Sequence, residues 1–161
     1  MEKEKAIQRY IRCQESLKAV LANIPEDRII TTTVEGAWTV KELLCHFIGW
    51  DQSLLEPLKT FVEKGDFSVK VFHDHDSYNA SQTSSRLSLS LEKVIQELEQ
   101  TSQALLNLVA SLDRDQCQAI FSAPWGGEGT IPAMLAGLAW HIDDHLKHVN
   151  AAFSLSQDEK P

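Results

Sequence analysis

The feature that most constrains this chain is a helical period of apolar residues that recurs in four long segments. The segments span roughly residues 2–24, 39–65, 88–112 and 130–153, and in each the apolar positions advance by three or four. A helix of this kind has one apolar face that must be buried against another element. The chain is therefore predicted to be all-α, with residues 1–153 forming one four-helix bundle.

Local signals mark where these helices begin and end. Pro25 ends the first segment, and Thr39 with Glu42 forms a capping box at the start of the second. Thr130 is a good N-cap for the last helix, because a proline follows in the first turn. Pro57 lies inside the second segment and is expected to kink the helix or break its late part.

The second connection, residues 65–87, is long and irregular, with a short helix expected near 77–86. A connection of this length permits a crossover, so the directions of the four helices stay open. Residues 154–161 form a polar C-terminal tail, and no segment shows the alternation of a convincing strand.

Charge and composition exclude several classes of partner. The 15 Lys and Arg residues against 23 Asp and Glu give a net charge of −8, which opposes binding to nucleic acid. No apolar stretch approaches a membrane span, and the charged N-terminus does not resemble a signal peptide, so we expect a cytoplasmic protein without a membrane partner. The cysteines are unpaired by spacing and are expected to be reduced thiols: Cys13, Cys45 and Cys117.

Histidines on two of the predicted helices could share one metal ion. His141 and His145 are four residues apart, which places both imidazoles on one face of the last helix. His46 lies on the apolar stripe of the second helix and is the candidate for a third ligand. The competing interpretation is that the three histidines bind no metal and are ordinary packed or surface side chains. A zinc-protease motif is excluded, because no glutamate follows His141.

Two short motifs resemble those of a known superfamily. The segment Gly36-Ala37-Trp38-Thr39-Val40-Lys41-Glu42-Leu43-Leu44-Cys45-His46 resembles the helix-two motif of the DinB-like, or YfiT-like, superfamily, and Trp140-His141-Ile142-Asp143-Asp144-His145 resembles its helix-four motif. That superfamily includes the N-terminal domain of mycothiol-dependent maleylpyruvate isomerase, the bacillithiol transferases and the ClbS/DfsB group. Tyr78-Asn79-Ala80 is similar to a segment of the last group.

The resemblance implies a four-helix bundle with a divalent site made of three histidines. The family's ligands fall on His46, His141 and His145, and all three are present. Members are seen with zinc or nickel, and three imidazoles suit both ions. Three protein ligands leave at least one coordination position open.

Residues near these ligands are weaker candidates for catalysis. His148 could be a fourth ligand or a proton relay, or a solvated histidine near a helix C-terminus. Asp144 could orient a ligand imidazole, or be an exposed acid. The run His73-Asp74-His75-Asp76 is expected to be a solvated polar turn on a mobile loop.

The sequence also predicts where three of the tryptophans and Cys45 lie. Trp50 and Trp140 are expected in the core, whereas Trp125, beside two glycines, is the candidate for a loop at the mouth of a pocket. Cys45 adjoins His46 but points about 100° away on a helix, so it is expected to be a packing thiol.

Three hypotheses about function follow. In the first, the chain is a metal-dependent enzyme acting on a small-molecule substrate, because a metal with an open position acidifies a bound water or thiol. The resemblance implies thiol-dependent transfer or isomerisation with a low-molecular-weight thiol as cosubstrate, or hydrolysis. In the second, the chain binds and sequesters a small molecule without turnover. In the third it is a helical dimerisation module; a homodimer is compatible with all three.

Overall fold

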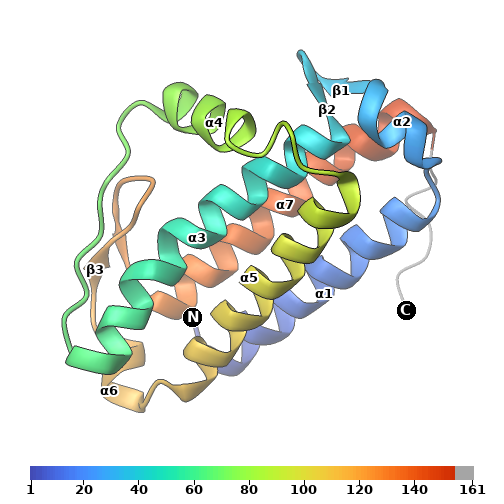
Figure 1. The fold of residues 1–161 in the computed structure, drawn as a ribbon. Helices are drawn as coiled ribbons and strands as arrows, with labels where there is room; N and C mark the ends of the chain where they lie inside the picture. The colour runs from blue at the N-terminus through green and yellow to red at the C-terminus, as the bar shows by residue number, and fades with distance from the viewer. Residues whose placement is uncertain (155–161) are drawn as a thin grey trace.

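The computed structural model describes residues 1–154, and its four long helices form a bundle (Figure 1). These helices confirm the predicted fold class: α1 (Lys3–Ala22), α3 (Val40–Lys64), α5 (Leu91–Ser111) and α7 (Ile131–Phe153). The predicted polar tail lies outside the described residues except for Ser154. The helix α3 continues through Pro57 without the expected break.

Short elements occupy the connections between the long helices. The helix expected near 77–86 is present as α4 (His75–Ser84), which begins two residues earlier. Sequence analysis missed the other short elements, because each is too short to show a period. They are α2 (Glu26–Thr31), α6 (Arg114–Gln118), the antiparallel pair β1 (Thr33–Glu35) and β2 (Trp38–Thr39), and the antiparallel pair β3 (Phe121–Ser122) and β4 (Glu128–Gly129).

The long second connection is a crossover, so α3 and α5 run in the same direction (Figure 1). Lys41, at the start of α3, donates from Nζ to the carbonyl of Leu89, just before α5, at 2.5 Å. Lys3, at the start of α1, reaches the carbonyl of Leu112 at the other end of α5, at 2.8 Å. The helices α1 and α5 are therefore antiparallel, and the order of directions is up, down, down, up.

Local capping explains where the long helices start. Thr39 and Glu42 form the predicted capping box, and Ser90 and Thr130 cap α5 and α7 through their side-chain oxygens. The apolar stripes then meet in one core. Its largest fully buried side chains come from all four long helices and include Tyr10, Leu44, Leu54, Leu105, Leu135 and Ile142.

A buried carboxylate interrupts this core. Asp51, which is 1% exposed, accepts hydrogen bonds from the hydroxyl of Tyr10 and, at 3.3 Å, from that of Ser102. Burial raises the pKa of Asp51 to about 7, although both hydrogen bonds oppose that shift. The group ties α1, α3 and α5 together at the centre of the bundle.

Within the described residues, none of the helices is both long enough and apolar enough to span a membrane.

Candidate metal centre

Three histidines from two helices meet at one point. Nε2 of His141 lies 2.9 Å from Nε2 of His46 and 3.0 Å from Nε2 of His145. His46 comes from α3 and the other two from α7. One ring nitrogen of each lies within 4.8 Å of the others, so the structure brings together the three residues that the sequence singled out.

Asn79 fixes which nitrogen of His46 carries the proton. Its Oδ1 atom lies 3.0 Å from Nδ1 of His46 and 3.0 Å from Nε1 of Trp50. An indole nitrogen only donates, so Oδ1 is the acceptor and Nδ1 of His46 is the donor. Nε2 of His46 therefore presents its lone pair to the other two histidines.

Glu35 fixes which nitrogen of His145 carries the proton. Nδ1 of His145 donates to Oε2 of Glu35 at 2.5 Å, which leaves the lone pair of His145 Nε2 facing His141. Glu35 ends β1, and Gly36 turns the chain with a φ of 55°, a left-handed conformation that glycine adopts without strain. The β1–β2 hairpin thus delivers a carboxylate to α7.

This arrangement fits a shared cation. The Nε2 lone pairs of His46 and His145 both face Nε2 of His141. A single proton on that atom cannot form a good hydrogen bond to both lone pairs. A cation bound by all three nitrogens resolves the conflict. Neutral imidazoles suit zinc, nickel and similar ions and suit magnesium or calcium poorly. A partner on Nδ1 that orients the ring is the usual surrounding of a metal-binding histidine.

Burial keeps the imidazoles of His46 and His141 neutral. Burial lowers the pKa of His46 to about 3, and the neighbouring His141 and His145 add to that effect. Burial, helped by His145, lowers the pKa of His141 to about 4. Neutral imidazole is the form that binds a metal, so protons do not compete with a metal for His46 and His141 near pH 7.

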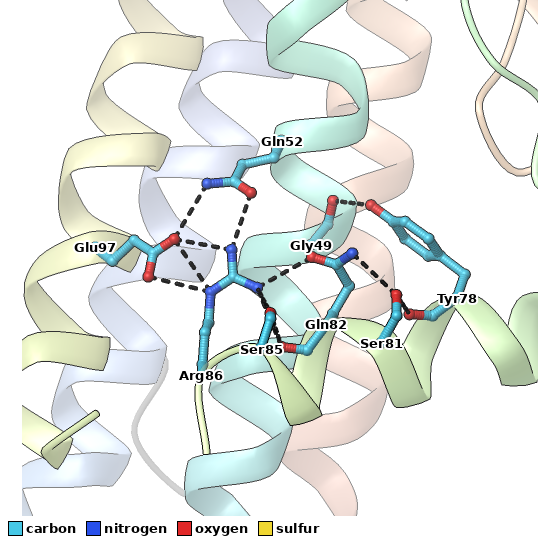
Figure 2. A network of polar contacts seen from close by, with 8 residues as sticks. All are labelled: Gly49, Gln52, Tyr78, Ser81, Gln82, Ser85, Arg86 and Glu97. Carbon is cyan, nitrogen blue, oxygen red and sulfur yellow. Dashed lines mark hydrogen bonds and ion pairs between the residues drawn. The ribbon is translucent and has the colours of Figure 1, made fainter. Parts of the chain in front are cut away.

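An ion pair between the buried Arg86 and the half-buried Glu97 holds the helix that carries Asn79 (Figure 2). Arg86, in the turn after α4, donates from Nη2 to Oε1 of Glu97 on α5 at 2.8 Å and to Oε1 of Gln52 on α3 at 2.9 Å. Nη1 donates to the carbonyl of Gln82 on α4 at 3.1 Å. One guanidinium therefore joins α3, α4 and α5.

Close packing completes the docking of α4. Figure 2 shows the hydroxyl of Tyr78 donating to the carbonyl of Gly49 on α3, at 2.6 Å. A Cβ atom at Gly49 would lie 2.3 Å from Cγ of Gln82, so α4 approaches α3 as closely as it does because position 49 has no side chain. Gly49 is three residues after His46, and this contact lies beside the metal centre.

A cavity of about 310 Å³ opens beside the histidines. His46 and His141 form one side of it, and three tryptophans from α3, α7 and the β3–β4 loop form much of the rest. The full lining is His46, Trp50, His75, Asn79, Trp125, Gly137, Leu138, Trp140 and His141. The volume is at the lower end of the range for small-molecule sites.

The structure separates the weaker candidates from the ligands. His148 is exposed and is not part of the histidine group. Asp144 pairs with Lys147 at 2.8 Å, which lowers the pKa of its carboxyl group, and the carboxylate that contacts a ligand imidazole is that of Glu35.

Two expectations about surrounding residues need correction. Trp140 is 56% exposed and not in the core, because it stands at the open side of the cavity, whereas Trp50 is buried as expected. The run of residues 73–76 is exposed as expected, but it starts a helix rather than forming a turn: Asp74 caps α4, and His75, the first residue of α4, also lines the cavity. Trp125 lines the cavity, as predicted for a loop at its mouth.

The cysteines are free thiols that do not belong to the histidine group. Cys45 is buried, and burial raises the pKa of its thiol to about 11, consistent with the predicted packing role. Cys13 and Cys117 are also free thiols.

Glu35 and Asn79 are the residues that sequence reasoning missed. Glu35 precedes a glycine in a Thr-rich loop, where nothing marks it as a partner of α7. Asn79 lies in the Tyr78-Asn79-Ala80 stretch, which carried a resemblance but no assigned role.

The fold and the histidine group define a class: four-helix bundles with a histidine cluster for a metal between facing helices. Residues 9–149 match the model of the DinB superfamily. Because this match covers most of the chain, the chain belongs to the DinB superfamily, and the resemblance found in the sequence is confirmed.

Relatives and solved structures agree with this membership. An Oceanobacillus iheyensis protein named "Putative metal-dependent hydrolase" is 24% identical over 132 residues, which cover 82% of this chain and 74% of that protein. YfiT from Bacillus subtilis, described as a probable metal-dependent hydrolase with an unusual four-helix bundle topology, superposes with a TM-score of 0.72 and 17% identity, covering 96% of this chain and 89% of that one.

A structure of the mycothiol-dependent maleylpyruvate isomerase superposes with a TM-score of 0.75 and 11% identity, covering 92% of this chain and 61% of that one. At these identities the two structural likenesses show a common fold.

Proposed function

We propose that this chain is a metal-dependent hydrolase of a small molecule, with His46, His141 and His145 as the ligands of one divalent ion. The observation that carries the proposal is the tautomer pattern: Asn79 and Glu35 hold the Nδ1 protons of His46 and His145, and both free lone pairs point at one place. The names of the curated relatives support the same class of activity.

A divalent ion bound by three imidazoles supplies a Lewis acid with an open coordination position, which acidifies water near neutral pH. The chain's own residues supply the rest. The aromatic cavity takes up the substrate beside His46 and His141 and limits the access of bulk water to the reacting bond. The hydrogen bonds that Asn79 accepts from His46 and Trp50, and the Arg86 ion pair, keep that wall in place.

We assign proton transfer to His75. In hydrolysis, the hydroxyl of water bonds to the electrophilic carbon, the bond to the leaving group breaks, and the remaining proton passes to the leaving group. Among the described residues, His75 is the one side chain lining the cavity, apart from the ligands, of a type that serves as a general acid or base.

The test combines metal analysis with turnover. We expect about one zinc or nickel ion per chain after loading, and hydrolysis of phenyl acetate that stops on chelation and returns with the ion. His141→Ala should lose metal and activity together. His148→Ala is the matched control, because it changes an exposed histidine on the same helix. A chain that binds no divalent ion would refute the proposal.

The His75 assignment needs its own variant. His75→Gln should bind metal like the unchanged chain and lower turnover by about 10²- to 10⁴-fold, the range for one acid–base group. Equal turnover in both proteins would remove His75 from the reaction.

The fold likeness to the mycothiol-dependent isomerase favours a second candidate, in which a low-molecular-weight thiol is cosubstrate at the same ion. Turnover of an electrophile that requires added thiol, and no turnover of esters in its absence, would select it. Tight binding of a ligand by the metal-loaded chain without turnover would instead support sequestration.

A further inference from the structure

The cavity beside the histidines has a chemical character that its lining residues define. None of the nine lining residues, all within the described part of the chain, is a lysine, arginine, aspartate or glutamate. Three are tryptophans, and the nearest aliphatic surface comes from Leu138. A cavity of this kind holds its ligand through apolar contact and the shape of flat rings.

The indole nitrogen of Trp50 already has a hydrogen-bond partner. Nε1 of Trp50 donates to Asn79, so the indole presents carbon to the cavity. Its ring contacts that of Trp125 at a centroid distance of 6.2 Å and an angle of 70°, and that of His75 at 5.3 Å and 82°. The rings brace one another edge to face, the preferred arrangement of aromatic pairs, and form a rigid corner.

The mouth of the cavity continues the aromatic surface. Trp140 lines it and is 56% exposed, an unusual position for a large apolar side chain on α7. Gly137 lies against this wall, because a Cβ atom there would lie 3.6 Å from Cζ2 of Trp125, in ordinary van der Waals contact. A larger side chain at position 137 would cover part of the Trp125 ring, which the glycine leaves exposed to the cavity.

The lack of charged side chains in the lining, together with the proposed divalent ion, favours an uncharged ligand. A cationic group would find no carboxylate in the lining, and the proposed divalent ion would repel it. An anionic substituent directed away from the ion would find no lysine or arginine and would lose its hydration without compensation. An uncharged group meets neither cost.

We propose that the substrate is an uncharged molecule that places a flat, single aromatic ring against Trp50, Trp125 and Trp140, with its reacting bond toward His46 and His141. A volume of about 310 Å³ accommodates one ring and a short substituent, since a cavity of about 150 Å³ already holds benzene. This inference rests on the proposed function for the direction of the reacting bond; ring binding itself does not require turnover.

The experiment measures binding of unreactive probes by ligand-observed NMR titration, on the full chain, both zinc-loaded and chelated. The probes are benzamide, cyclohexanecarboxamide, terephthalamate and 4-(trimethylammonio)benzamide. We expect benzamide to bind in both states, and the non-planar and charged probes to bind about tenfold more weakly or worse. Equal binding of cyclohexanecarboxamide, or tighter binding of either charged probe, would overturn the inference.

A cavity-filling variant locates the binding. Gly137→Leu should fill the space beside Trp125, weaken benzamide binding by about tenfold or more and leave zinc content unchanged. Ala133→Leu, one turn earlier on the exposed face of α7, is the matched control. Undiminished benzamide binding by Gly137→Leu, or benzamide binding that vanishes on chelation, would overturn the inference. Benzamide binding without any hydrolysis would instead count against the proposed function alone.

Discussion

Glu35 accepts a hydrogen bond from Nδ1 of His145 across 110 positions of the sequence, at 2.5 Å. The bond joins a two-stranded hairpin to the last helix and turns the free lone pair of His145 toward His141. The carboxylate is half-buried, so the contact is shielded from solvent on one side. It gives the hairpin a role in ordering the candidate metal centre.

Removal of this carboxylate should weaken metal binding. Partners that orient a ligand imidazole typically contribute 10- to 100-fold in metal affinity, so we expect Glu35→Ala to raise the zinc Kd by about that factor. Competition with a chromophoric chelator measures it. Asp144→Asn is the control: its carboxylate pairs with Lys147, and its Kd should stay within about twofold of the parent. A larger increase in the zinc Kd for Asp144→Asn than for Glu35→Ala would show that Asp144, and not Glu35, orients the ligand histidine.

The Arg86 ion pair should be a strong contributor to stability. Arg86→Met leaves Glu97 without its guanidinium partner and frees α4, and we expect a loss of about 1.5–3 kcal/mol in the free energy of unfolding, because Arg86 is buried and Glu97 is half-buried. Lys18→Met is the control, because Lys18 also pairs with a glutamate of α5, but the Lys18–Glu99 contact is exposed and is expected to contribute under about 1 kcal/mol. Urea unfolding of both variants measures the difference; equal losses would contradict the expectation.

The long helices could be predicted because their signals are local. The capping box at Thr39 and Glu42, and the cap at Thr130, depend on residues three positions apart. The directions of the helices could not be predicted, because the crossover depends on where residues 65–90 dock. That docking is decided by contacts such as those of Arg86 with Glu97 and Gln52, which no local pattern shows.

The candidate site likewise contains residues that could be predicted from the sequence and residues that could not. Spacing on one helix indicated His141 and His145, and the apolar stripe of the second helix indicated His46. Glu35 could not be found by spacing, because its partner lies on the far side of the sequence. The exposure of Trp140 could not be predicted because residues 131–140, the first half of α7, are apolar on nearly all sides, so the helical period does not distinguish their exposed face.

Asp51 should make stability depend on pH. Its folded-state pKa is raised to about 7 from an ordinary value of 3.8, so between these values the folded chain binds more protons than the unfolded chain. The contribution of Asp51 is therefore fully present below about pH 4 and is lost as the pH rises through 7. Three pKa units correspond to about 4 kcal/mol.

The variant that isolates this effect is Asp51→Asn, which keeps an acceptor for Tyr10 and does not titrate. The difference in unfolding free energy, variant minus parent, should rise by up to about 4 kcal/mol between pH 4 and pH 8. Other carboxyl groups titrate in both proteins and cancel. A difference that stays constant with pH would show that the buried carboxyl group does not change its protonation state in this range.

The close contact between Gly49 and Gln82 allows a test of whether the docking of α4 supports the metal centre. Gly49→Ala places a Cβ atom 2.3 Å from Cγ of Gln82, so α4 must shift, and the shift carries Asn79 away from His46. We expect a loss of about 1–3 kcal/mol in unfolding free energy and a weaker affinity for zinc. Gln82→Ala alone should cost less, through its lost hydrogen bond to Arg86. In the double variant the clash with Cγ is gone, so zinc affinity should recover to that of Gln82→Ala. Strictly additive losses would show that the approach of α4 to α3 does not govern the site.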